Sequence, residues 1–155
     1  MLPTNRPALV KMIRDAFDGN VYPGDGNIFE DIYDPDIDSW RELLLGVSWE
    51  EALGKLEALV GTDQNYYETM VYFMTTEALH YYTPMYLILA MDPDSQALPG
   101  AFIFSLPPEH NNLVLSLYTP EQKQVIALTL QECFREMDED FDEALKKFWF
   151  QFLPG

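Results

Sequence analysis

Acidic side chains recur at alternate positions in two short segments, residues 34–38 and 138–142, the spacing with which many calcium-binding loops begin. An EF-hand loop also needs a glutamate at its twelfth position. The first segment places Leu45 there and the second places Trp149. We therefore predict that these acids are helix caps and first-turn residues, which complement the helix dipole, and that they do not bind a metal ion.

The other residues capable of metal binding or nucleophilic chemistry are few and poorly spaced. His80, His110 and Cys133 lack the paired spacing of a zinc site, which needs about four ligands. A nucleophilic serine of the hydrolase type would sit in a Gly-x-Ser-x-Gly turn, and the chain has none. The sequence therefore predicts a protein that is not an enzyme and that uses no metal or cofactor.

An aromatic segment around His80 is the candidate for a small-ligand pocket. Glu77, His80, Tyr81 and Tyr82 fall on one predicted helix. Aromatic residues at helical spacing belong to the core more often than to a pocket, and a buried tyrosine hydroxyl needs a hydrogen-bond partner. No Lys or Arg occurs between Lys55 and Lys123, so those partners should be backbone groups, acids or His80. The pocket remains an alternative to a core role.

The composition describes one acidic domain. The 155 residues include 26 Asp and Glu against 9 Lys and Arg, a formal net charge of −17. This charge argues against binding to nucleic acid or to an anionic membrane, since both require basic patches. Hydrophobic residues make up 48%, enough for one core, so we expect a single domain over residues 1–155. The longest apolar stretch, residues 79–91, is shorter than the roughly 20 residues of a membrane helix, and a cytoplasmic protein is expected.

Helix start and stop signals predict a mainly α protein, a compact single-domain bundle of about six helices with at most a short extended segment at 101–105 or 113–117. Capping residues mark three starts, at Ser48, at Thr75 or Thr76, and at Thr119. Pro84 should kink or break the helix in which it lies. The first and last predicted helices cover about residues 6–18 and 140–152. Between them, one helix starts at Pro35 and is closed by Gly46, and one starts after Ser48 and is stopped at Gly61. The helix that reaches Pro84 has residues 85–90 as its continuation beyond the break, and the helix after Thr119 is separated from the last one by residues 138–142. Residues 66–73 fit either a helix or a strand.

One stretch resembles a known family. Residues 73–87 read FMTTEALHYYTPMYL, which is similar to a pattern F-[LM]-T-x-E-A-x-x-Y-Y-x-P-x-Y-L found in a family of uncharacterised bacterial proteins of about this length. The later segments 117–125 and 144–149 resemble two further motifs of that family. The resemblance implies relatedness and a shared helical fold. It implies no activity, because none is assigned to the family.

The function that fits these features best is a small acidic interaction module that binds a basic protein partner, for example an immunity-type inhibitor of a toxin. Charge would steer the encounter and aromatic residues would anchor the complex. A small-ligand or enzyme domain around His80 and a nucleic-acid mimic are the alternatives, and the oligomeric state is left open. The acids predicted to contact the partner form two groups, namely Asp34, Asp36 and Asp38, and Asp138, Glu139 and Asp140.

Overall fold

A computed structural model describes residues 6–30, 35–58, 73–91, 115–136 and 149–153 of the chain. The described residues form five α-helices and three short 3-10 turns, and within these ranges the chain contains no β-strand, only a single bridge between Phe29 and Met74. The predicted mainly α fold is confirmed. The helices are α1 (Arg6–Ala16), α2 (Pro35–Leu44), α3 (Trp49–Glu57), α5 (Thr76–Ala90) and α7 (Pro120–Glu136). The 3-10 turns are η1 (Asp25–Asn27), η5 (Leu115–Leu117) and η6 (Trp149–Phe152).

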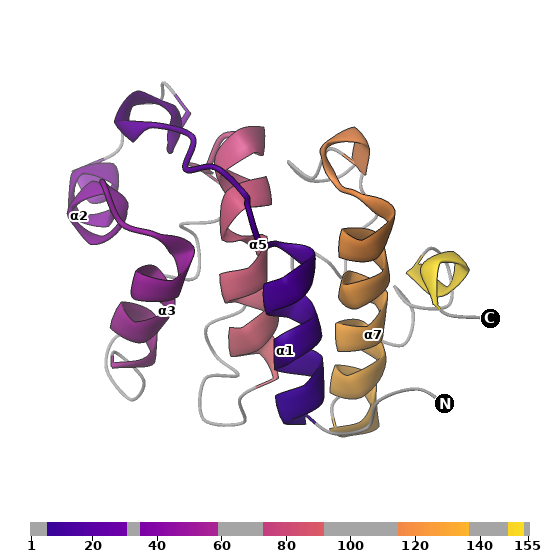
Figure 1. The fold of residues 1–155 in the computed structure, drawn as a ribbon. Helices are drawn as coiled ribbons and strands as arrows, with labels where there is room; N and C mark the ends of the chain where they lie inside the picture. The colour runs from indigo at the N-terminus through magenta and orange to yellow at the C-terminus, as the bar shows by residue number, and fades with distance from the viewer. Residues whose placement is uncertain (1–5, 31–34, 59–72, 92–114, 137–148, 154–155) are drawn as a thin grey trace.

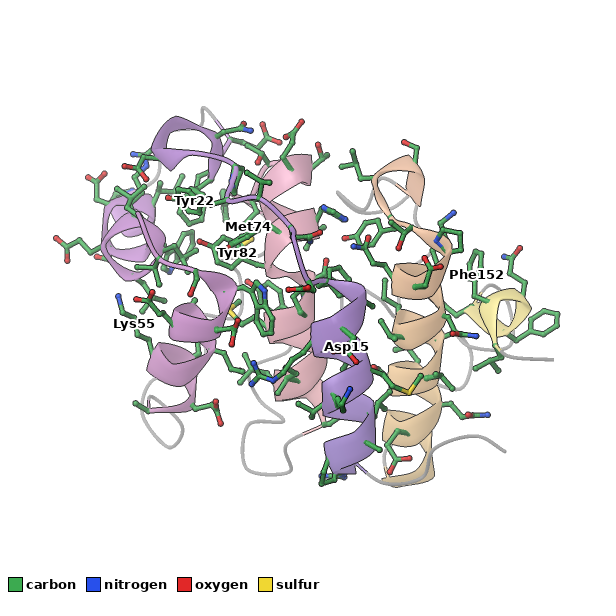
Figure 2. All side chains as sticks on the ribbon, in the orientation of Figure 1. Asp15, Tyr22, Lys55, Met74, Tyr82 and Phe152 are labelled. Atoms are coloured by element: carbon green, nitrogen blue, oxygen red, sulfur yellow. The ribbon has the colours of Figure 1, made fainter. Side chains whose placement is uncertain are left out.

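Helix α5 lies at the centre of a compact bundle. It packs against α3 on one side and against α1 and α7 on the other, as Figure 1 shows. The remaining pairs are α1 with α7, α7 with η6, and α2 with α3. Most described residues of α5 are buried, which is expected of a central helix with a largely apolar sequence. The base-free aromatic segment of the sequence therefore supplies the core (Figure 2), with side chains that include Leu79, Tyr82, Met85, Tyr86 and Leu89.

Side-chain caps begin three of the helices at the predicted residues. The hydroxyl of Ser48 accepts a hydrogen bond from the Glu51 N–H at 3.2 Å, and that of Thr75 accepts one from the Ala78 N–H at 3.0 Å. Thr119 and Gln122 form a reciprocal capping box. The Thr119 hydroxyl accepts the Gln122 N–H at 3.2 Å, and Gln122 Oε1 accepts the Thr119 N–H at 3.0 Å.

Of the kink or break predicted at Pro84, the break is wrong, because α5 continues as one helix from Thr76 to Ala90. A proline inside a helix removes one backbone hydrogen bond and crowds the preceding turn. Here residues 81–87 around the proline are all buried, and their packing outweighs that cost. The neighbouring Thr83 hydroxyl also donates a hydrogen bond to the Leu79 carbonyl at 2.7 Å, and it lies 2.6 Å from the Tyr118 hydroxyl.

Other predictions fall partly or wholly outside the described residues. Residues 101–105 and most of the predicted last helix at 140–152 lie outside them. The described end of that helix, Trp149–Phe152, forms a 3-10 turn. Residues 115–117 also form a 3-10 turn, so that part of the possible extended segment is not extended. In the described part of the chain, no helix combines the length and the apolarity that crossing a membrane requires.

Candidate functional site

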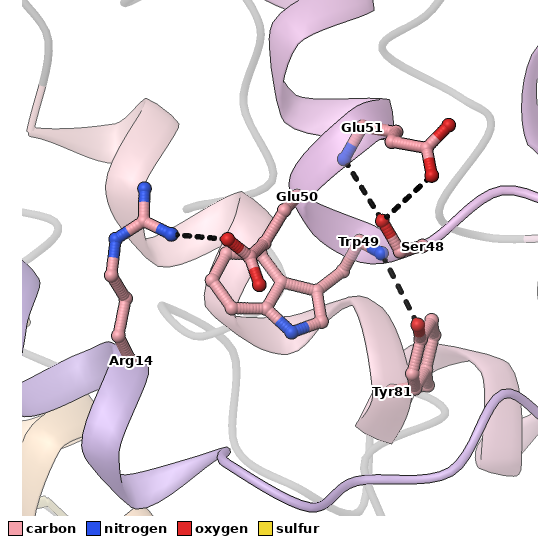
Figure 3. Close-up of polar contacts among 6 residues, drawn as sticks. All are labelled: Arg14, Ser48, Trp49, Glu50, Glu51 and Tyr81. Carbon is pink, nitrogen blue, oxygen red and sulfur yellow. Dashed lines mark hydrogen bonds and ion pairs between the residues drawn. The ribbon is translucent and has the colours of Figure 1, made fainter.

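A polar depression opens between the C-terminal end of α1 and the N-terminal end of α3. It has a volume of about 380 Å³, and we call it the α1–α3 depression. One wall comes from the last turn of α1 and the turn that follows it, the other wall from the first residues of α3, and Tyr81 of α5 contributes to the lining (Figure 3). The lining residues are Arg14, Asp15, Phe17, Asp18, Gly19, Asn20, Ser48, Trp49, Glu50 and Tyr81.

An arginine crosses the α1–α3 depression. Arg14 Nη1 lies 2.7 Å from Glu50 Oε2, and the Arg14 guanidinium carbon lies 5.4 Å from the centroid of the Trp49 ring. The side chains of Arg14 and Glu50 remain 43% and 61% exposed, so water screens this ion pair. The two walls are therefore joined at the surface by a contact that solvent can reach.

The first turn of α3 is held from below by Tyr81. The Tyr81 hydroxyl accepts a hydrogen bond from the Trp49 N–H at 3.3 Å. Burial raises the pKa of Tyr81, the nearby carboxylates of Glu50 and Glu51 raise it further, and the Trp49 N–H opposes them. The phenol therefore stays neutral at physiological pH and serves as a fixed hydrogen-bonding group. With the Ser48 cap, it holds the backbone of the first turn of α3, which carries Trp49 and Glu50.

A buried amide lies behind the wall formed by α1. Gln122 is only 3% exposed, and its Nε2 donates to the Ala16 carbonyl at 3.1 Å and to Asn20 Oδ1 at 3.3 Å. Its Oε1 lies 2.9 Å from His80 Nε2, and because an amide oxygen can only accept, His80 Nε2 is the donor. This network fixes the end of α1 against α5 and α7. It thereby positions the turn that carries Asp18.

The fold engages the cations of the described residues and leaves many carboxylates unpaired. The structure describes the side chains of six Lys and Arg residues, and each of these six cations has an internal contact. Lys11 pairs with Asp15 and Arg41 with Asp38, as Arg14 does with Glu50; Arg6 donates to the Met91 carbonyl, Lys55 donates to the Leu43 carbonyl, and Lys123 lies over the Phe152 ring. Exposed carboxylates that form no ion pair with these described cations include Asp18, Glu30, Glu42, Glu57, Glu77 and Glu121.

The predicted partner-binding acids are only partly placed. Asp38 is 87% exposed and lies 3.5 Å from Arg41, one turn away on α2. Asp36 is on the same helix, and its side chain is outside the described part of the chain. The remaining predicted acids, Asp34, Asp138, Glu139 and Asp140, lie outside the described residues.

The four residues of the predicted ligand pocket do not converge on one cavity. Tyr82 is fully buried, and its hydroxyl donates to carbonyls at the end of α2 and in the turn after it. His80 is half-buried, with its ring centroid 4.6 Å from that of Tyr118. Glu77 is exposed, and Tyr81 alone of the four lines the α1–α3 depression. The expectation that tyrosine hydroxyls here bond to backbone groups is confirmed for Tyr81 and Tyr82.

Sequence reasoning missed Arg14, Asp18, Trp49 and Glu50. Arg14 and Glu50 are 36 positions apart, and neither belongs to a motif. The available signal was weak. Charged residues stand on the last turn of one predicted helix and on the first turn of another, and nothing in their spacing indicates that the two turns face each other.

A metal site is not formed by the described residues. Within them, no group of three or more His, Cys, Asp or Glu side chains is arranged to hold a metal ion. A second depression, of about 480 Å³, lies along α7 beside η6 and is lined by Pro120, Glu121, Lys123, Gln124 and Phe152. Its lysine already lies over the Phe152 ring. The α1–α3 depression is the more polar of the two and is the better candidate site.

Comparison with protein families gives a match over nearly the whole chain. Residues 5–153 match a family described only as a family of unknown function, DUF6714. No curated protein and no solved structure matches the chain. The resemblance to a family of uncharacterised proteins is thus confirmed, and the chain belongs to the DUF6714 family.

Proposed function

We propose that this protein is a small acidic binding module, without catalytic activity, whose ligand is a basic protein. The observation that supports the proposal is that the described cations form internal contacts while many exposed carboxylates form no ion pair with them. The described cations are held by internal contacts, whereas carboxylates at the surface remain available. In the described part of the chain, exposed carboxylates without an ion-pair partner, such as Asp18, Glu42 and Glu57, contribute to the formal net charge of −17.

We propose the α1–α3 depression as the contact site, because it combines carboxylates with a concave surface. Asp18 and Glu50 line it, and Asn20, Ser48 and Tyr81 add hydrogen-bonding groups. A negative surface of this kind attracts a positive one over a distance of about 10 Å at moderate salt. Contact then depends on the fit of partner side chains into the depression, which supplies specificity.

Such a module acts by covering the basic surface of its partner. An immunity-type inhibitor, which masks the working surface of a basic toxin in the cytoplasm, is one form of this function. The long-range attraction suits that role, because it accelerates association with a partner that must be neutralised quickly.

The test is capture from a lysate of the source cells, compared between charge-matched variants. Site variant Asp18→Asn/Glu50→Gln and control variant Glu42→Gln/Glu57→Gln each remove two negative charges from exposed positions. Wild-type protein and the control should retain a basic protein that is released at about 0.5 M salt, because salt screens exposed charges. The site variant should retain about tenfold less of the same protein, since it loses charges at the contact itself.

Identification of the captured protein is followed by binding of the two purified proteins. A Kd that weakens steeply with salt and that distinguishes the site variant from the control supports the proposal. Failure to capture any basic protein, or capture that salt leaves unchanged, contradicts it.

A further inference from the structure

We propose that the ring of Trp49 and the carboxylate of Glu50 form a binding site for a guanidinium group. In this structure Arg14 of the same chain occupies the site, and an arginine of the basic partner would take its place. The inference rests on the proposed function, for which it names the chemical group that the α1–α3 depression recognises.

The geometry around Arg14 is that of an arginine receptor. Its guanidinium carbon lies 5.4 Å from the Trp49 ring centroid, within the range of a cation–π contact, and its Nη1 lies 2.7 Å from Glu50 Oε2. An aromatic face together with a carboxylate favours arginine over lysine, because guanidinium is planar and carries several donors. Tyr81 and Ser48 hold the backbone of the first turn of α3, so the helix turn that carries both receptor groups is held without Arg14.

The occupant is exchangeable. Arg14 and Glu50 are 43% and 61% exposed, and exposed ion pairs of this kind contribute little to stability. The helices that carry them each pack against α5, so neither helix depends on the pair for its position. Trp49 is 7% exposed with Arg14 over its ring, and removal of the arginine would uncover that face.

A second carboxylate is available to an incoming arginine. Asp18 lies on the same depression, is exposed, and forms no ion pair with the described cations. Arg14 already satisfies Glu50, so Asp18 provides the charge that attracts the partner before the exchange takes place. Displaced Arg14 returns to water at the rim, where its charge is screened.

The test compares two variants that remove the same charge from the same helix. Arg14→Ala frees Glu50 and uncovers Trp49, whereas Lys11→Ala frees Asp15, also in the depression, and uncovers no aromatic ring. The probes are blocked tetra-arginine and tetra-lysine peptides, measured by isothermal titration calorimetry at low salt. Arg14→Ala should bind tetra-arginine about fivefold more tightly than Lys11→Ala does, given the usual strength of an exposed cation–π contact and ion pair. Adding Glu50→Gln to Arg14→Ala should abolish this gain.

Two results would overturn the inference. One is equal affinity of Arg14→Ala and Lys11→Ala for tetra-arginine, and the other is an equal gain for tetra-lysine. If binding in either case stays salt-dependent, the acidic module still stands and only the guanidinium site is wrong. If no variant binds either peptide, both proposals fail. Arg14→Gln is the second variant if Arg14→Ala lacks the helical circular dichroism of the wild type.

Discussion

Two tyrosines one turn apart on α5 give a prediction that separates hydrogen bonding from burial. Tyr82 is fully buried, and its hydroxyl lies 3.2 Å from the Leu44 carbonyl and 3.0 Å from the Val47 carbonyl. The change Tyr82→Phe keeps the ring and leaves these carbonyls without that donor. A buried acceptor that loses its donor costs about 1–2 kcal/mol. The melting temperature should therefore fall by roughly 3–6 °C for a chain of this size.

Tyr86 is the matched control. It is 4% exposed, and its hydroxyl has no hydrogen-bond partner among the described residues. The change Tyr86→Phe removes a buried polar atom that gains nothing from the fold, so it should be neutral or stabilising by up to about 1 kcal/mol. Urea denaturation of both variants gives the difference in unfolding free energy. An equal loss in the two variants would refute the reasoning, because removal of the hydroxyl would then cost the same with a hydrogen-bond partner and without one.

The remaining predictions concern pH, capping and glycine geometry. Burial raises the pKa of Tyr82 and of Tyr118 above the ordinary value, the Thr83 hydroxyl opposing this at Tyr118. The folded chain therefore keeps phenolic protons that the unfolded chain loses, and the unfolding free energy should fall by about 1.4 kcal/mol per pH unit for each such tyrosine above about pH 10. Tyrosinate absorbance that appears below the unfolding pH in the wild type, and that is lost in Tyr82→Phe or Tyr118→Phe, would contradict this. Thr119→Ala should cost about 1 kcal/mol in urea denaturation, because it removes the α7 cap, and an unchanged midpoint would count against the capping box. Gly46 has a φ of +69°, so Gly46→Ala should lower the free energy of unfolding by about 1 kcal/mol. Gly54 lies inside α3 with open space around it, so Gly54→Ala should raise the free energy of unfolding by about 0.5–1 kcal/mol. Changes in unfolding free energy of the same sign in the two glycine variants would contradict this reasoning.

The local features of the fold were predictable because they depend on neighbouring residues. The caps at Ser48 and Thr119 follow from short sequence signals that operate within one turn. The central position of α5 follows from its largely apolar sequence, which contains no Lys or Arg. The continuation of α5 through Pro84 was not predictable, since a local rule for proline takes no account of the packing that surrounds the helix.

The candidate site was not predictable for a different reason. It depends on how two distant helices meet, and the contact between Arg14 and Glu50 spans 36 positions. The sequence contains many acids, so the prediction selected the segments richest in aspartate. The described member of the first segment, Asp38, is paired with Arg41 on its own helix. A carboxylate becomes a candidate binding group through its surroundings, and these are set by the tertiary structure.

The central claim is that basic ligands are recognised at the α1–α3 depression and not by the acidic surface in general. The most direct measurement is a nuclear magnetic resonance titration of backbone amides with a blocked tetra-arginine peptide. The account predicts shifts concentrated at residues 14–20 and 48–50, which line the depression. Shifts spread evenly over the exposed acids of α2 and α3, such as Glu42 and Glu57, with none concentrated at the depression, would contradict it.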